Sequence, residues 1–411
     1  TSSFNVAYNS LIFSSEYTFD VTDKFSLTPE FIFKKQEPYH NENQNAKDAF
    51  IFYNVLAQRT TGRFTANYNL SDRVNFIGGL EMYHDQASAS DSFDYFLPDN
   101  PEDSLQSKVQ YMNYAAFAQG LVKTQFVDVL AGLRFEENSA FGSSFVPRLA
   151  LTKAFDKFHF KFLASQAFRA PAISNINTNS VAIAEGMPGV EEIEPEKTTV
   201  LELEAGYRIG SNMFVAANLF DITINDPIVY FYSEDLDIEG YQNYDQSGTR
   251  GMELDLRYSD EWGNINLTYS HYMQADKNKV ATYTVPDAFD SEALVGFNRD
   301  KLTLFTSFNL GENLSISPWM VYTGKKYGWA PETDDAGEIV WEINQEFDPA
   351  VLLNFFVSYN NLFTEKLSFG AGIYNALDEE ILYVQPYEGY HSALPGASRE
   401  IMLKLSYNLF K

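Results

Sequence analysis

The chain consists of repeated stretches of about ten residues in which apolar and polar side chains alternate. In the clearest stretch, one set of alternate positions holds Leu201, Leu203, Ala205, Tyr207 and Ile209, and the other holds Glu202, Glu204, Gly206 and Arg208. Similar stretches occupy residues 252–258 and 158–165. Successive side chains of a strand point to opposite faces, so the pattern predicts strands with one apolar and one polar face along the whole chain.

Short and long connections alternate strictly between these predicted strands. We identify eight short turns, centred on Asp23-Lys24, Ser71-Asp72, Thr124-Gln125, Asp156-Lys157, Gly210-Ser211, Trp262-Gly263, Glu312-Asn313 and Thr364-Glu365. Eight longer polar connections separate them, at about residues 37–49, 85–108, 137–143, 170–196, 226–249, 275–298, 324–349 and 378–398. Outer-membrane barrels have this arrangement, with short periplasmic turns and long external loops.

The sequence therefore predicts an all-β fold, an antiparallel transmembrane β-barrel with about 17 strands that occupies residues 1–411 as one domain. The lipid-facing residues should include Phe160, Phe162, Leu201, Leu203, Leu254 and Leu256. Single-chain bacterial barrels have an even number of strands, so we expect further strands to precede Thr1, which would lie outside the cell.

The composition supports a membrane barrel and excludes some other classes of protein. Aromatic residues make up 16% of the chain, more than a soluble core requires, and interfacial girdles would account for the excess. No stretch approaches the roughly 20 apolar residues of a membrane-spanning helix. The net charge of −27 argues against a nucleic-acid partner, because phosphates are bound by clustered Lys and Arg.

Five short motifs occur in the order and spacing of a known family. They are Pro147-Arg148-Leu149-Ala150-Leu151, Ser165-Gln166-Ala167-Phe168-Arg169-Ala170-Pro171, Glu194-Pro195-Glu196-Lys197 leading into Leu203-Glu204-Ala205-Gly206-Tyr207, Ser247-Gly248-Thr249-Arg250-Gly251-Met252-Glu253, and Asn375-Ala376-Leu377-Asp378 followed by Pro395-Gly396 and Arg399. From about Tyr114 onward, the chain resembles the TonB-dependent outer-membrane receptors through these motifs.

The resemblance implies an outer-membrane location and a 22-stranded barrel around an N-terminal plug, so the plug and about five strands would be missing from this chain. It also implies active import of a scarce ligand, such as a siderophore, glycan, peptide or cobalamin-like molecule, powered by the TonB complex. The protein would lie among outer-membrane lipid and lipopolysaccharide. Two alternatives stay open: a passive diffusion channel, and a surface barrel that anchors a partner protein such as a surface lipoprotein.

Enzymatic function and a bound cofactor are not expected. The five His residues are scattered, without the spacing of a zinc site or of a Ser-His-Asp triad. Heme receptors of the family carry a His after the motif that ends at Pro171, and residues 172–193 contain none. Acid pairs such as Asp235/Asp237 and Asp334/Asp335 could bind Ca²⁺, but their spacing alone does not establish a metal site.

Two groups of residues are candidates for the functional site. The first should line the lumen and form charge pairs across neighbouring strands: Arg169, Glu202, Glu204, Arg208, Glu253, Asp255 and Arg257. The second lies in the long loops and could stack on a flat ligand: Tyr232, Tyr241, Tyr244, Trp329, Trp341, Tyr387 and Tyr390. The alternative for the charges is a structural brace of the wall, and for the aromatic residues it is the external girdle.

Overall fold

A computed structural model of the chain describes residues 6–41, 55–89, 108–172, 175–176, 179, 183, 191–233, 238–286, 289–290, 292–333, 339–384, 386 and 393–409. The chain divides into two compact units. Unit 1 contains residues 1–151, 164–199 and 224–245, and unit 2 contains residues 152–163, 200–223 and 246–411.

The strands follow one another in simple order. Unit 1 holds β1 (Val6–Glu16), β2 (Phe19–Thr22), β3 (Phe25–Asn41), β4 (Val55–Ser71), β5 (Val74–Ala89), β6 (Lys108–Lys123), β7 (Asp128–Asn138), β12 (Ile228–Ser233) and β13 (Ile238–Asn243). The unit boundaries fall within or next to β8 (Gly142–Ala154), β9 (Phe158–Arg169), β10 (Glu196–Ile209) and β11 (Met213–Asn225). Unit 2 also holds β14 (Gln246–Asp260), β15 (Gly263–Met273), β16 (Asp300–Leu310), β17 (Leu314–Thr323), β18 (Lys326–Thr333), β19 (Ile339–Phe347), β20 (Ala350–Tyr359), β21 (Leu367–Tyr374), β22 (Leu382–Tyr383), β23 (Leu394–Pro395) and β24 (Glu400–Tyr407).

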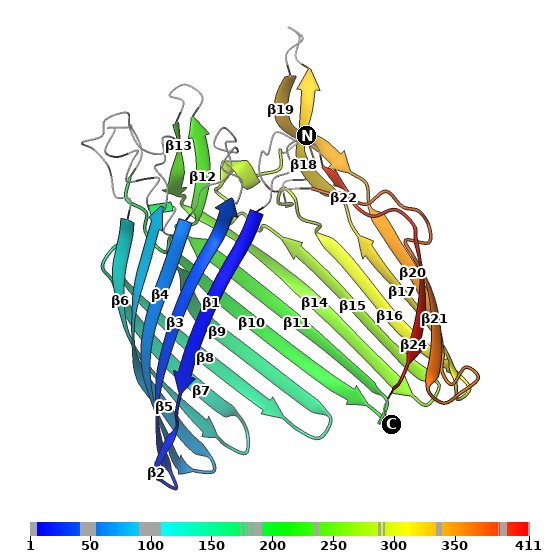
Figure 1. Cartoon of the computed structure of the whole chain (residues 1–411), viewed down its shortest axis with the longest axis horizontal. Helices are drawn as coiled ribbons and strands as arrows, with labels where there is room; N and C mark the ends of the chain where they lie inside the picture. Colours follow the sequence, from blue (N-terminus) through cyan, green and yellow to red (C-terminus); the bar gives the residue numbers. More distant parts are fainter. Residues whose placement is uncertain are drawn as a thin grey trace. The chain divides into compact units, whose positions relative to one another are not determined.

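Within the described residues, eighteen strands belong to one sheet, and the registers resolved between neighbours are antiparallel (Figure 1). Strands β1 and β2 both pair with β3, one after the other, so they are two segments of a single strand. Counted in this way, the sheet has seventeen strands, as predicted. The all-β antiparallel fold predicted from the alternation is confirmed.

All eight predicted short turns connect adjacent strands of the sheet. The turn at Trp262-Gly263 shows why its sequence matters. Gly263 has a φ of 147°, and a Cβ at this position would lie 2.0 Å from the carbonyl oxygen of Ser307. Only glycine combines that backbone conformation with such a close approach of the neighbouring strand.

The long connections contain more regular structure than the sequence suggested. Three of them include a two-stranded hairpin: β12–β13, β18–β19 and β22–β23. A fourth contains the 3-10 helix Ala281–Tyr283, and the connection between β7 and β8 is only three residues long. The expected strand length of about 10 residues fits β16 and β17, with 11 and 10 residues, but is too short for β3 and β4. These two strands each have 17 residues and continue beyond what a membrane crossing needs.

The apolar faces of the strands are exposed, and many polar side chains on the opposite faces are buried. Leu80 on β5 is 63% exposed, whereas its neighbour Glu81 is 8% exposed. The predicted lipid-facing residues Leu201, Leu203 and Leu254 are also exposed, while Phe160, Phe162 and Leu256 are partly buried. A strand of a soluble protein buries its apolar face, so this inversion indicates that the apolar face of the sheet meets hydrocarbon.

An apolar cluster lies in the connections of unit 2. Val285, Ala293 and Val295 from the β15–β16 connection pack with Tyr327 of β18, and Trp329 packs against them. At the opposite ends of the strands, Trp262 stacks between Tyr258 and Phe308 beside a short turn, as expected for an interfacial aromatic girdle. Among the described residues, no helix combines the length and apolar character needed to span a membrane.

Candidate functional site

A row of charged residues crosses strands β3 to β7 on the polar face of unit 1. Cross-strand pairing places Glu30 opposite Arg63, and Arg63 opposite Glu81. The row continues through Ala115 on β6 to Glu136 on β7. Directly paired residues of antiparallel strands point to the same face, so the hairpin registers bring these side chains together.

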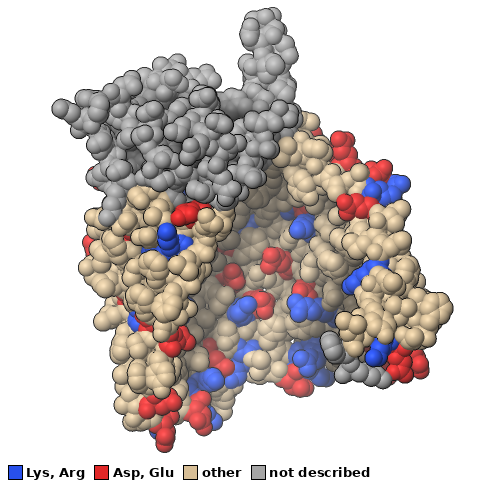
Figure 2. Space-filling view, in the orientation of Figure 1, with Lys and Arg blue, Asp and Glu red and all other residues tan. Residues whose placement is uncertain are grey.

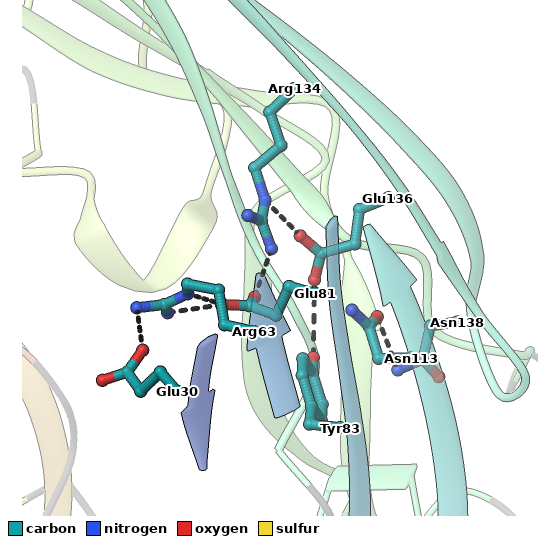
Figure 3. A network of polar contacts seen from close by, with 8 residues as sticks. All are labelled: Glu30, Arg63, Glu81, Tyr83, Asn113, Arg134, Glu136 and Asn138. Atoms are coloured by element: carbon teal, nitrogen blue, oxygen red, sulfur yellow. Dashed lines mark hydrogen bonds and ion pairs between the residues drawn. The ribbon is translucent and has the colours of Figure 1, made fainter. Parts of the chain in front are cut away.

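Two arginines link three carboxylates into a continuous network (Figure 3). Arg63 donates from Nη1 to Glu30 Oε2 at 2.9 Å and from Nε to Glu81 Oε2 at 2.6 Å. Arg134 donates from Nη2 to Glu81 Oε1 at 2.6 Å and from Nε to Glu136 Oε2 at 2.7 Å. Glu81 is therefore the central acceptor, since both of its oxygens are bound by arginines from different strands.

The small side chain of Ala115 makes this network possible. It lies between Glu81 and Glu136 in the row and is only 5% exposed. Arg134 comes from the next row, opposite Phe117, and reaches Glu81 on β5 even though β6 separates the two strands. A large residue at position 115 would occupy the space between the two strands that the guanidinium bridges.

A second polar layer lies farther from the short turn, where Arg59 on β4 pairs with Asp85 on β5. Arg59 forms a two-point contact with Asp85, with Nε–Oδ1 and Nη2–Oδ2 distances of 2.6 Å, and its guanidinium carbon lies 4.3 Å from the ring centre of Tyr83. The Tyr83 hydroxyl donates to Glu136 at 3.4 Å and so connects the two layers. Such two-point arginine contacts fix geometry as well as charge.

This arrangement provides a rigid polar wall and offers no chemistry for making or breaking bonds. The charged row of β3 to β7, together with Arg134, has three carboxylates and two guanidinium groups, and each of these groups contacts a partner of opposite charge. Among the residues that the structure describes, no three His, Cys, Asp or Glu side chains are grouped as metal ligands. The proposed Ca²⁺ pairs Asp235/Asp237 and Asp334/Asp335 lie outside the described residues.

The predicted lumen-lining residues are placed on several strands. Arg169, the last residue of β9, donates from Nε to Glu196 at 2.7 Å and from Nη2 to the carbonyl oxygen of Ile228 at 3.1 Å. Glu204 on β10 contacts His159 Nε2 at 2.8 Å and Lys161 Nζ at 3.1 Å. Glu202 and Arg208 occupy the same face of β10 as Glu204.

The predicted residues on β14 have different contacts. Glu253 accepts a hydrogen bond from Asn218 Nδ2 at 3.2 Å, whereas Asp255 pairs with Arg257 on its own strand at 2.9 Å. Figure 2 shows acidic and basic side chains interspersed on the visible face, without a large patch of one sign. The role of all seven residues in lining a lumen stays a prediction.

An aromatic pair lies on the same face of unit 2 as these charges. Cross-strand pairing forms one row from Arg257 through Asn266, Phe305 and Trp319 to Asn354. The rings of Phe305 and Trp319 stack with a centroid distance of 5.4 Å, and Phe305 is 47% exposed. This pair could not be predicted from the sequence, because two aromatic residues on a polar face do not follow the alternation.

The predicted loop aromatics are only partly described. Tyr241 lies on β13, and its ring contacts that of Tyr230 edge-on at 5.6 Å. Asn179 holds the Tyr241 backbone, accepting from its N–H at 2.9 Å and donating to its carbonyl oxygen at 2.6 Å. Tyr244 follows β13 and donates from its backbone N–H to the carbonyl oxygen of Pro227.

Of the other loop aromatics, Trp329 is the one whose side chain is described. It packs on the apolar cluster of unit 2, and its buried indole nitrogen has no hydrogen-bond partner among the described residues. The side chains of Tyr232 on β12 and Trp341 on β19, and all of Tyr387 and Tyr390, lie outside the described residues. Ligand binding by these seven residues stays a prediction.

Two neighbouring lysines at the start of the β18–β19 hairpin titrate differently. This hairpin lies in the connection between the spanning strands β17 and β20. The pKa of Lys325 is raised because its ammonium group pairs with Glu346. Burial lowers the pKa of Lys326, whose Nζ donates to the carbonyl oxygen of Leu382 at 2.7 Å.

Comparison with known proteins gives one match to a family model and several matches to solved structures. The model described as "TonB dependent receptor-like, beta-barrel" matches residues 1–376. The search of curated proteins returned no match.

The similar structures are themselves receptors and transporters. The FrpB iron transporter from Neisseria meningitidis (F3-3 variant) matches with a TM-score of 0.69 at 14% identity, over 97% of this chain and 62% of FrpB. The siderophore receptor PirA from Acinetobacter baumannii matches with a TM-score of 0.58 at 15% identity, over 97% of this chain and 71% of PirA. The ferric-catecholate import receptor Fiu from E. coli K12 matches with a TM-score of 0.67 at 12% identity, over 99% of this chain and 65% of Fiu.

The exposed apolar strands and the polar opposite face thus define an outer-membrane barrel protein. The chain belongs to the TonB dependent receptor-like β-barrel family of Gram-negative bacteria. The family resemblance inferred from the five motifs is confirmed, and so is the expectation of a non-enzymatic protein. The chain spans 62% of the length of FrpB, and at these identities the likeness to solved structures concerns the fold.

Proposed function

We propose that the protein to which this chain belongs imports an iron chelate across the outer membrane and that a TonB complex powers the import. The observation that carries the proposal is the charged row of β3 to β7, in a chain of this family. Glu30, Arg63, Glu81, Arg134 and Glu136 hold one another by short contacts on the face turned away from the exposed apolar side chains.

A paired charge network suits a passage through which a polar ligand must move. Its two guanidinium groups and three carboxylates leave a small net charge, so the wall would neither trap an anionic ligand nor strongly exclude it. Each charge already has a partner, so a passing ligand does not have to neutralise a buried charge of the wall. A wall of paired charges favours transport over tight anchoring of a second protein.

The class of ligand is proposed from the similar structures. Their names describe an iron transporter, a siderophore receptor and a ferric-catecholate import receptor. The stacked rings of Phe305 and Trp319 would suit a ligand with planar groups, because aromatic faces stack on flat rings. If iron chelates are not taken up, the imported ligand would instead be a glycan, a peptide or a cobalamin-like molecule.

Uptake by the natural host tests the proposal. A deletion strain and its parent would be grown on limiting iron, and uptake of radiolabelled iron would be measured from ferric enterobactin and from ferric citrate, with and without functional TonB. We expect the deletion to reduce uptake of one complex, and loss of TonB to reduce it to the same level. Uptake that is unchanged without TonB would support a passive channel, and no defect in the deletion strain would support a surface anchor.

A further inference from the structure

A hollow of about 550 Å³ lies on the apolar face of β4 to β7 in unit 1. Small residues, including Ala66, Gly78, Ala118 and Ala131, line it, and the larger side chains of Tyr68 and Phe76 border it. These residues occupy one face of the sheet, since Ala66 pairs with Gly78, and Gly78 pairs with Ala118. The hollow is open along one side of the sheet and does not enclose a ligand.

The hollow opens on the side of the sheet that meets hydrocarbon. On the same face of β4 and β5, Phe64 and Leu80 are among the exposed large apolar residues. The charged row containing Glu81 lies on the opposite face. A ligand of this hollow must therefore be apolar and must approach from within the membrane.

Its position along the strands assigns the hollow to one leaflet. Phe76 is three residues from Arg73 in the β4–β5 turn, and Ala118 is five residues from the end of β6 at Lys123. A tilted strand crosses the hydrocarbon in about 9–11 residues, so the hollow occupies the half next to the short turns. Short turns are periplasmic in such barrels, so this half belongs to the inner leaflet.

The exposed charges at the same end of the strands match a phospholipid headgroup. The β2–β3 turn contains Lys24 and the β4–β5 turn contains Arg73, each next to an aspartate. Both basic side chains are exposed and long enough to reach a phosphate at the interface. The neighbouring Asp23 and Asp72 keep this edge from being strongly cationic, which suits a zwitterionic headgroup.

We propose that this hollow binds one acyl chain of an inner-leaflet phospholipid, whose phosphate lies near Lys24 and Arg73. The inference is independent of the imported ligand, because it concerns the outward face of the sheet. A second copy of the chain is the rival occupant, since it could place a large side chain in the same hollow.

Two matched pairs of variants of the full-length protein test the proposal. Ala118→Phe would fill the hollow, and its control is Ala116→Phe, on the same face of β6 but outside the hollow. Gly78→Leu has the control Gly62→Leu, on the same apolar face and with open space around it. Heat-dependent electrophoretic mobility would first confirm that each variant folds.

Retained phospholipid would be counted by native mass spectrometry after purification in mild detergent. We expect the two hollow-filling variants to retain about tenfold less phospholipid than their controls, equivalent to losing the burial of roughly two methylene groups. Equal retention within each pair would overturn the proposal. A dimer that Ala118→Phe converts to a monomer would assign the hollow to a second copy instead.

A measurement on the unchanged protein covers the case in which the variants do not fold. Phosphatidylethanolamine with a photoreactive group on its acyl chain would be incorporated into vesicles with the wild-type protein. Crosslinks concentrated in the peptides that contain residues 66–78 and 118–131 would support the proposal. Crosslinks spread evenly over the apolar strand faces would contradict it.

Discussion

Arg63 and Glu81 pair directly across the β4–β5 hairpin, and Arg63 Nε donates a hydrogen bond of 2.6 Å to Glu81 Oε2. Because Arg134 binds the other oxygen of the same carboxylate, one acid holds two arginines from strands on either side of it. The buried charge of Glu81 is thus compensated twice, which explains how a carboxylate with 8% exposure is retained in the wall.

Replacing Glu81 should destabilise the protein. The Glu81→Gln variant keeps the shape but leaves Arg63 and Arg134 without their shared negative charge. Removing one partner of a buried pair costs about 3–5 kcal/mol, and partial exposure of the arginines should reduce the loss to about 2 kcal/mol. Urea unfolding in lipid vesicles, followed by tryptophan fluorescence, measures this loss in the free energy of unfolding.

Glu253→Gln is the matched control for that experiment. Glu253 is exposed and accepts one hydrogen bond, from Asn218, so its loss should cost no more than about 0.5 kcal/mol. Equal effects of the two substitutions would show that the Glu81 network does not stabilise the wall.

Replacing the two adjacent glycines of β5 by alanine should have opposite effects on the free energy of unfolding. An added Cβ at Gly79 would lie 2.5 Å from both the Phe64 carbonyl oxygen and the Phe117 ring, whereas Gly78 has room for it. We expect Gly79→Ala to lower the free energy of unfolding by about 1–3 kcal/mol, and Gly78→Ala to leave it unchanged or raise it by about 0.5 kcal/mol. The same unfolding assay compares them, and a Gly79→Ala variant as stable as wild type would contradict the packing of Phe117 against β5.

The strands and short turns could be predicted because their signals are local. Alternation along residues 201–209 fixes the two faces of β10, and turn-forming residues such as Ser71-Asp72 mark where a strand reverses. The hairpins in the long connections were missed because polar loop composition concealed strands that continue outside the membrane, as at Ile228–Ser233.

The charged row was only partly within reach of the sequence. The alternation places Arg63 and Glu81 on the polar faces of neighbouring strands, but their direct pairing depends on a register irregularity between Asn69 and Ser71, next to the β4–β5 turn. The contact between Arg134 and Glu81 is different, because it spans β6 and depends on the small size of Ala115. Side-chain reach across an intervening strand cannot be read from alternation.

Asn179 should stabilise the β12–β13 hairpin. Its amide contacts both the N–H and the carbonyl oxygen of Tyr241 and also donates to the carbonyl oxygen of Glu191. Asn179→Ala would leave these backbone groups unpaired, at a local cost of about 1–3 kcal/mol. Hydrogen exchange should therefore become about tenfold faster or more at residues 238–243, while β14 and β15 serve as an internal control. Unchanged exchange at Tyr241 would contradict the role of Asn179.

The pH dependence of stability should reveal the burial of Lys326. Burial lowers the pKa of Lys326 in the folded state below its ordinary value of 10.5, so the folded protein holds this proton less tightly than the unfolded chain does. The unfolded chain then binds more protons between the two pKa values, and the stability of the wild type should rise with pH in that window below 10.5.

Lys326→Met removes this dependence, so its stability relative to wild type should be greatest at neutral pH and should decline towards pH 10.5. Lys325→Met is the control, because pairing with Glu346 raises the pKa of Lys325 and predicts the opposite trend. Urea unfolding at a series of pH values tests both variants, and parallel curves for Lys326→Met and wild type would show that the ammonium group of Lys326 remains solvated.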